Sequence, residues 1–157
     1  MAMHGCSIEW ARGDAGFTDL KYSRAHRWTF DGGAQVRASS SPHSVRLPFS
    51  DATAVDPEEA LVAAVASCHM LWFLSLAAEQ GFVVDSYSDA AQGRMGTFDD
   101  GKRGIVEVLL QPQVVVSGAK RPDDAAIQAL HHAAHERCDI GNSIRGEVRV
   151  QGRWSIA

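Results

Sequence analysis

The sequence lacks the features that mark several common classes of protein. Three cysteines, Cys6, Cys68 and Cys138, are an odd number, which argues against a disulfide scaffold. No CxxC pair, phosphate-binding glycine loop, internal repeat or low-complexity tract is present. The 15 basic residues are scattered and are outnumbered by 19 acidic ones, giving a net charge of −4, so no nucleic-acid partner is expected. What remains is an ordinary globular composition of 157 residues, enough for one domain over residues 1–157.

The start of the chain also lacks the pattern of a secretion signal. Its first ten residues, MAMHGCSIEW, have no basic region followed by an apolar core, so we expect a cytoplasmic protein. Residues 60–78 carry no formal charge and approach the length of a membrane span. This stretch is rich in alanine, contains Ser67 and His69, and is flanked by carboxylates instead of lysine or arginine. We therefore expect a buried central helix and no membrane partner.

The order of the predicted elements indicates an α+β fold. Helices are predicted at 56–80 and 122–138, and residues 1–20 are predicted to be a loose arm. The expected strands are 23–30, 34–39, 45–49, 82–95, 104–116 and 146–154. Helices and strands do not alternate strictly, which excludes a Rossmann fold and favours mainly antiparallel sheets.

Each predicted helix carries one cysteine on an apolar stripe. Asp56 is a good N-cap for the first helix and Gly81 a natural residue after its end. The stripe of this helix is Leu61, Val65, Cys68, Trp72 and Leu76; that of the second is Ile127, Leu130, Ala134 and Cys138. Both cysteines should therefore face a core, where a free cysteine is usually a small hydrophobe. A chemical role would require a thiolate and a nearby positive group.

The acidic candidate for a partner, Glu58, precedes Cys68 by ten residues. In one straight helix this places them about 15 Å and roughly 80° apart, so they cannot touch directly. A shared site would need the glutamate of a second chain or an elongated pocket, together with an arginine to offset its charge. The candidate arginines are Arg24, Arg27, Arg37 and Arg46.

Two motifs resemble those of one known family. Pro57-Glu58-Glu59, followed by Ala63-Ala64 and Ser67-Cys68, is similar to the first conserved helix of the OsmC/Ohr family of osmotically induced and organic hydroperoxide resistance proteins. Cys138 with Asn142-Ser143-Ile144 resembles the region of its second cysteine. The resemblance covers roughly residues 22–152 and rests on two motifs 70 residues apart, on the expected helices.

The resemblance implies an intertwined homodimer with two long central helices wrapped by sheets, and a thiol peroxidase that needs no cofactor or metal. Cys68 would attack organic hydroperoxides, and often hydrogen peroxide, and Cys138 would form a disulfide with it that a dithiol reductant reopens. Glu58 would orient an arginine beside Cys68. Arg24 is our preferred arginine, because Ser23-Arg24-Ala25-His26 precedes the aromatic residues Trp28 and Phe30, although Arg46 also fits.

The sequence departs from the family pattern in two further places. Asp139 follows Cys138 and is expected to raise the pKa of that thiol. His69 follows Cys68 and either tunes it or is satisfied in the core. Trp72 and Phe73 could line a peroxide pocket or belong to a dimer core.

Two other functions stay open. One is a non-catalytic protein of the same fold that binds a hydrophobic small molecule at the dimer interface. The other is a metal site on the second helix, where His131 and His135 have i, i+4 spacing. We expect the histidines of this helix, which include His132, to form an ordinary polar face instead.

Overall fold

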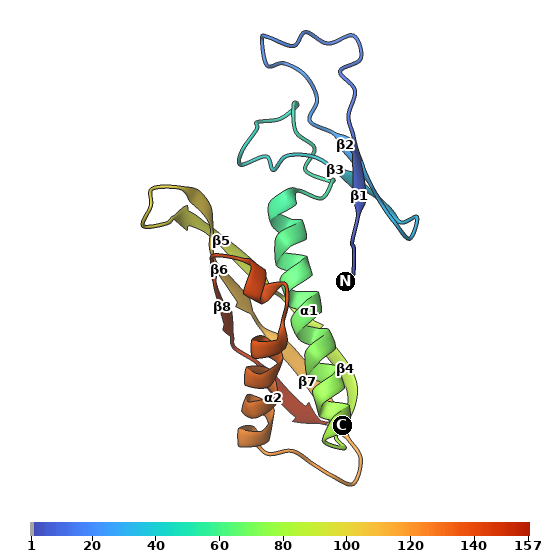
Figure 1. The fold of residues 1–157 in the computed structure, drawn as a ribbon, viewed down its shortest axis with the longest axis vertical. Coiled ribbons are helices and arrows are strands. Elements are labelled where there is room, and N and C mark those ends of the chain that lie inside the picture. Colours follow the sequence, from blue (N-terminus) through green and yellow to red (C-terminus); the bar gives the residue numbers. More distant parts are fainter. Residues whose placement is uncertain (1) are drawn as a thin grey trace. The chain divides into compact units, whose positions relative to one another are not determined.

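The computed structural model describes residues 2–157 and divides them into two compact units, the first ending at Ala60 and the second running Leu61–Ala157 (Figure 1). The first unit contains a three-stranded antiparallel sheet in the order β1-β2-β3. Its strands are β1 (Cys6–Glu9), β2 (His26–Phe30) and β3 (Gln35–Ala38). The turn between β2 and β3 needs Gly33, whose φ is 85°.

Two predictions for the first unit were wrong. The prediction of a loose arm fails at Cys6–Glu9, which pairs along its whole length with β2; Met1 lies outside the described residues. The predicted strand at 45–49 is a series of turns, because the Val45 N–H donates to the Ser41 carbonyl and the Phe49 N–H to that of Arg46.

The helix α1 (Pro57–Glu79) begins and ends as predicted. The Asp56 carboxylate accepts a hydrogen bond from the Glu59 N–H at 2.7 Å, and the Glu59 carboxylate accepts one from the Asp56 N–H at 3.2 Å. This reciprocal capping box satisfies two N–H groups that the first turn leaves without helical partners. At the other end Gly81 adopts a φ of 76°, which stops the helix without a Cβ clash.

Each long strand predicted for the second unit is two strands. Residues 82–95 form β4 (Val83–Asp89) and β5 (Gln92–Thr97), and residues 104–116 lie in β6 (Arg103–Leu110) and β7 (Pro112–Ser117). The C-terminal strand divides into β8 (Glu147–Val150) and β9 (Arg153–Ile156). One half of each pair joins the sheet β4-β7-β9 and the other joins β5-β6-β8, and each sheet has one antiparallel and one parallel pairing. The α+β fold with mainly antiparallel sheets is confirmed.

Side-chain contacts at the breaks explain why the strands divide. Gln111, between β6 and β7, donates its N–H to the side-chain carboxylate of Asp89 at 2.7 Å instead of to a backbone carbonyl of a neighbouring strand. Gly152, between β8 and β9, lies against His131: a Cβ at this glycine would come within 2.7 Å of the ring. These contacts join residues far apart in sequence, so the local pattern could not reveal them.

The helices α1 and α2 (Asp124–Arg137) cover the same side of the strands of the second unit (Figure 1). Two clusters of buried residues form its core. The larger cluster joins α1, β7 and α2, and consists of Phe73, Leu76, Ala77, Phe82, Val114, Val116, Ile127, Leu130 and Ala134. The smaller cluster joins α1 to β6, and consists of Val65, Val108 and Leu110. A short 3₁₀ helix, η1 (Gly141–Ser143), follows α2.

The buried stripe of α1 differs from the predicted one. Its buried residues are Val65, His69, Phe73, Leu76 and Ala77. Cys68 lies beside this stripe and is only half-buried. By length and composition α1 could also cross a membrane, a property it shares with the core helices of water-soluble proteins. The packing of α1 against two sheets favours the interpretation of this helix as a core helix.

Candidate active site

Cys68 lies in the wall of an open, mainly apolar cavity of about 470 Å³. One face of α1 supplies most of the lining, and the loop after α2 supplies Ile140: the α1 residues are Ala64, Ser67, Cys68, Leu71, Trp72 and Ser75. No charged side chain of residues 2–157 is part of this lining. A small molecule in the cavity would therefore meet apolar side chains, two serines and the Cys68 thiol.

Cys138 lies behind Cys68, with 1% of its surface exposed. Burial, followed by a hydrogen bond with the Cys68 thiol, raises the pKa of Cys138 to about 11. The N–H groups of Gly141 and Ile140 act in the opposite direction. The predicted influence of Asp139 is not among the causes of this rise. At neutral pH Cys138 is thus a protonated thiol beside Cys68, and both thiols are free.

The loop after α2 is fastened to Cys138. The Gly141 N–H donates to the Cys138 sulfur at 3.2 Å, and the Asn142 N–H donates to the Cys138 carbonyl at 2.9 Å. A third hydrogen bond, from the Ser143 hydroxyl to the Asp139 carbonyl at 2.7 Å, closes the same turn. This network holds Ile140, a wall of the cavity, in a loop that Cys138 itself organises.

Arg24 and Glu58 belong to the first unit, so they are described apart from the two cysteines. The Arg24 guanidinium donates to the Leu20 carbonyl at 2.7 Å and to the Tyr22 carbonyl, and lies 3.9 Å from the centre of the Tyr22 ring. These contacts hold the loop before β2. Glu58 is half-buried, and within residues 2–157 its carboxylate has no hydrogen bond or ion pair.

Among the other candidate arginines, Arg37 is occupied. It forms an ion pair with Asp51, and Thr53 and Arg37 together lower the pKa of that carboxyl, with Thr53 contributing most. Arg46 is exposed, and its side chain has no hydrogen bond or ion pair in the described part of the chain. By availability alone, Arg46 is therefore a stronger rival to Arg24 than the sequence indicated.

His69 and His131 form a buried pair between the two helices. Their exposed surfaces are 1% and 7%, and His69 Nε2 lies 3.1 Å from His131 Nδ1. Burial is the main cause that lowers the pKa of each imidazole to about 4, and His131 and His135 contribute to this lowering at His69. His69 thus lies in the core, where its Nδ1 and the Nε2 of His131 have no hydrogen-bond partner within residues 2–157. The prediction of an exposed polar face was wrong for His131.

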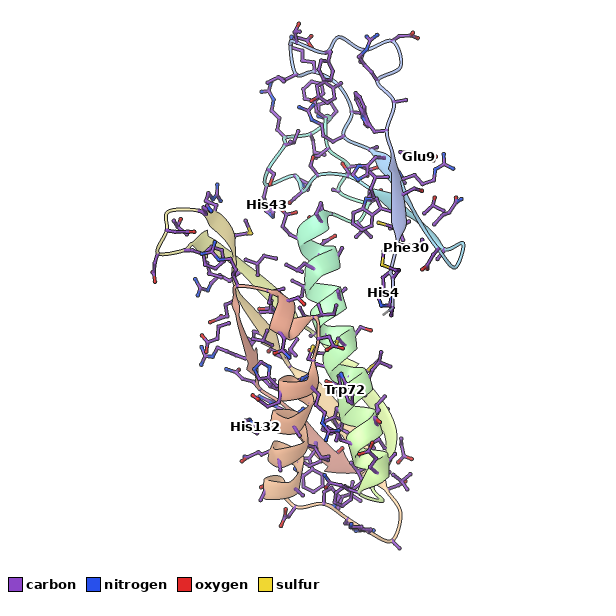
Figure 2. The ribbon with its side chains drawn as sticks, viewed as in Figure 1. His4, Glu9, Phe30, His43, Trp72 and His132 are labelled. Atoms are coloured by element: carbon purple, nitrogen blue, oxygen red, sulfur yellow. The ribbon has the colours of Figure 1, made fainter. Side chains whose placement is uncertain are left out.

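The remaining histidines of α2 border a second cavity, of about 450 Å³, between α2 and the β8–β9 connection. His132 lies on the side of α2 away from Trp72 (Figure 2). Across residues 2–157 no group of three or more His, Cys, Asp or Glu side chains is arranged to hold a metal ion. The i, i+4 spacing of His131 and His135 therefore has no further ligand to complete a site.

Arg137 was missed by sequence reasoning. Its guanidinium lies over the ring of Trp72, 5.6 Å from the ring centre, and Trp72 lines the cavity of Cys68. Figure 2 places Trp72 on α1 at the side of α2. The available signal was that Arg137 directly precedes Cys138 in the last turn of a helix, but we sought arginines only in the N-terminal strands and loops.

The fold and the paired thiols define an α+β protein with a two-cysteine site between two helices. The family model for OsmC-like proteins matches residues 50–152, and the chain belongs to this family. No match was found among curated proteins.

Solved structures agree with this assignment. An OsmC-like protein of unknown function from Vibrio cholerae is 49% identical, with a TM-score of 0.95 over 98% of this chain and 100% of its own. An organic hydroperoxide resistance protein from Elizabethkingia anophelis is 15% identical, with a TM-score of 0.66 over 100% and 98% of the two chains. The organic hydroperoxide resistance protein OhrB of Bacillus subtilis is 20% identical, with a TM-score of 0.60 over 98% of each. The last two share the fold.

Proposed function

We propose that this protein is a cytoplasmic, homodimeric hydroperoxide reductase that uses Cys68 and Cys138. The observation that carries the proposal is the asymmetry of the two thiols: Cys68 borders an apolar cavity, whereas Cys138 is buried and has a pKa raised by its burial and by the neighbouring Cys68 thiol. Such an arrangement suits a reaction in which one sulfur attacks the substrate and the other, buried beside it, then forms a disulfide with it. The names of the hydroperoxide resistance proteins that share the fold support the same chemistry.

In the first step the Cys68 thiolate attacks the terminal oxygen of an organic hydroperoxide, ROOH. The O–O bond breaks, Cys68 becomes a sulfenic acid, and the alkoxide takes a proton to leave as the alcohol ROH. The Cys138 S–H donates to the Val65 carbonyl at 4.0 Å, so a positive group elsewhere would have to stabilise the Cys68 thiolate. The apolar lining favours organic hydroperoxides over hydrogen peroxide, because their carbon skeletons lose water-exposed surface on binding.

In the second step the Cys138 sulfur attacks the sulfenic acid, a disulfide forms and water leaves. A dithiol reductant then exchanges with the disulfide, which restores both thiols and oxidises the reductant to its own disulfide. Cys138 must lose its proton during this step, and its burial, the main cause of its raised pKa, makes that slow at neutral pH. We therefore expect resolution, and not attack on the peroxide, to limit turnover near neutral pH.

The homodimer is supported by the apolar surface that α1 leaves uncovered in one chain. One face of this helix presents small and apolar side chains to solvent, and Leu71 is 61% exposed. The exposed residues of this face are Ala63, Ala64, Ser67, Leu71, Ser75 and Ala78. A second copy would cover this face and enclose the cavity. An arginine, Arg24 or Arg46, held in place by Glu58, would complete the site by stabilising the thiolate and the leaving alkoxide.

The test is a stopped-flow reaction of the reduced protein with cumene hydroperoxide and with hydrogen peroxide, followed by counting of free thiols. Wild type is expected to lose two thiols rapidly, Cys68→Ser none, and Cys138→Ser is expected to stop at a sulfenic acid that dimedone traps. Cys6→Ser is the matched control and should behave as wild type, because Cys6 is exposed on β1. Reaction of the wild type no faster than that of a free thiol would refute the proposal.

Arg24→Gln and Arg46→Gln identify the arginine in the same assay. Only the substitution of the arginine that stabilises the Cys68 thiolate should slow the first step. The expected loss is about 10²-fold, which is typical for the removal of one stabilising donor. If both variants react at the wild-type rate, neither Arg24 nor Arg46 takes part in the first step.

The second candidate is a non-catalytic protein that binds a hydrophobic small molecule. The raised pKa of Cys138 and the lack of a charged group in the cavity lining favour it. Binding of 2-phenylpropan-2-ol, the alcohol product of cumene hydroperoxide, without any peroxide reactivity would decide for this function.

A further inference from the structure

We propose that Arg137 is a specificity-determining residue that directs hydroperoxides bearing an anionic group into the Cys68 cavity. The proposal rests on the peroxidase function above, which it deepens by naming the charge of the preferred substrate. It starts from a cation, Arg137, that stacks on Trp72, one of the residues that line this cavity.

The cavity itself supplies only apolar and weakly polar contacts. Leu71, Trp72 and Ile140 provide its large apolar surfaces, and the two serines provide hydroxyl groups. This lining can hold the carbon skeleton of a substrate but cannot distinguish a neutral molecule from an anionic one. Discrimination by charge therefore has to come from a residue at its edge.

Arg137 has the position for that role. Its guanidinium and the cavity share one indole ring, that of Trp72, at a ring-centre distance of 5.6 Å. The contact keeps the charged end of a long, flexible side chain beside the cavity and reduces the conformational freedom lost on binding. Arg137 also belongs to the last turn of α2, directly before Cys138, so the same helix end positions both groups.

The charge of Arg137 is not neutralised by a neighbour. Glu136 and Asp139 flank it in sequence, yet within residues 2–157 neither forms an ion pair with it. Arg145, in contrast, stacks on Phe98 at 4.1 Å and also pairs with Asp100 at 3.2 Å. The planar guanidinium of Arg137 is thus available to bind a carboxylate through two parallel hydrogen bonds.

The experiment uses two probes that differ by one group, cumene hydroperoxide and its para-carboxylate derivative. Wild type is expected to prefer the carboxylate probe in kcat/KM, mainly through a lower KM, and added salt should reduce the preference. Arg137→Gln should lower the carboxylate-to-neutral ratio of kcat/KM about fivefold, the range of one exposed ion pair. Arg137→Lys, which keeps the charge without the planar fork, should retain part of the preference.

Arg145→Gln is the matched control, because it removes an arginine stacked on a ring elsewhere in the same unit. An unchanged ratio in Arg137→Gln, or an equal loss in Arg145→Gln, would overturn the proposal. Binding of the two alcohol products, 2-phenylpropan-2-ol and its para-carboxylate, provides a second readout by calorimetry. If the protein reduces neither peroxide, the proposed function fails. The effect of Arg137→Gln on these two affinities still decides whether Arg137 selects anions.

Discussion

The buried pair His69–His131 predicts a steep loss of stability in mild acid. Each imidazole has a pKa of about 4 in the folded protein and 6.5 as its ordinary value. Between pH 4 and pH 6.5 each of these histidines is therefore mostly protonated in the unfolded chain and mostly neutral in the folded chain. Stability is fully present above pH 6.5, is lost as the pH falls toward 4, and loses nothing more from these groups below pH 4.

The magnitude follows from the same two values. Between pH 7.5 and pH 5.0 each histidine should lower the free energy of unfolding by about 2 kcal/mol, and the pair by about 4 kcal/mol. That is a large part of the 5–15 kcal/mol typical of a domain. Burial raises the pKa of Asp89, so this carboxyl acts in the opposite sense at lower pH, and the range therefore stops at pH 5.0.

Urea unfolding at four pH values between 5.0 and 7.5, at fixed protein concentration, measures this effect. In wild type the slope of the unfolding free energy against pH should correspond to the uptake of nearly two protons on unfolding near pH 5.5. His131→Gln keeps a hydrogen-bonding group beside His69 but removes one titrating ring, so its slope should fall to about one proton. His132→Gln, the exposed neighbour, should leave it unchanged. A wild-type slope below one proton, or the wild-type slope in His131→Gln, would refute the reasoning.

Three further substitutions test the packing by urea unfolding. Gly152→Ala should destabilise by about 1–3 kcal/mol, because its Cβ would meet the His131 ring at 2.7 Å; unchanged stability would mean that the ring moves aside freely. Tyr87→Phe should be neutral or stabilising, since the buried Tyr87 hydroxyl has no partner within residues 2–157; a loss above about 1 kcal/mol would reveal a partner. Asp56→Ala should cost about 1 kcal/mol through loss of the capping box with Glu59, and an unchanged midpoint would show that the cap contributes nothing.

The helices and the cysteine pair were predictable because their signals are local or specific. Asp56 and Gly81 fix the ends of α1 through contacts with residues one turn away, so the sequence alone reveals them. The two cysteine motifs, 70 residues apart, led to the family that the match over residues 50–152 then confirmed. The roles of Cys68, Cys138, Glu58 and Arg24 stay predictions.

The strands were harder, because each predicted run divides between two sheets. The breaks at Gln111 and Gly152 depend on Asp89 and His131, which lie 22 and 21 residues away in the sequence. A pattern of hydrophobic residues within a short window contains no information on such contacts. The sequence analysis therefore predicted one long strand where the structure has two strands in different sheets.

The sequence by itself thus determined the helices, the α+β class and the presence of two cysteines on two helices. Only the tertiary structure decided which cysteine faces the cavity, that His69 meets His131 in the core, and that Arg137 lies over Trp72. The physical reason is that a helix cap is a short-range contact, whereas burial and thiol pKa depend on what packs against a side chain from elsewhere in the chain.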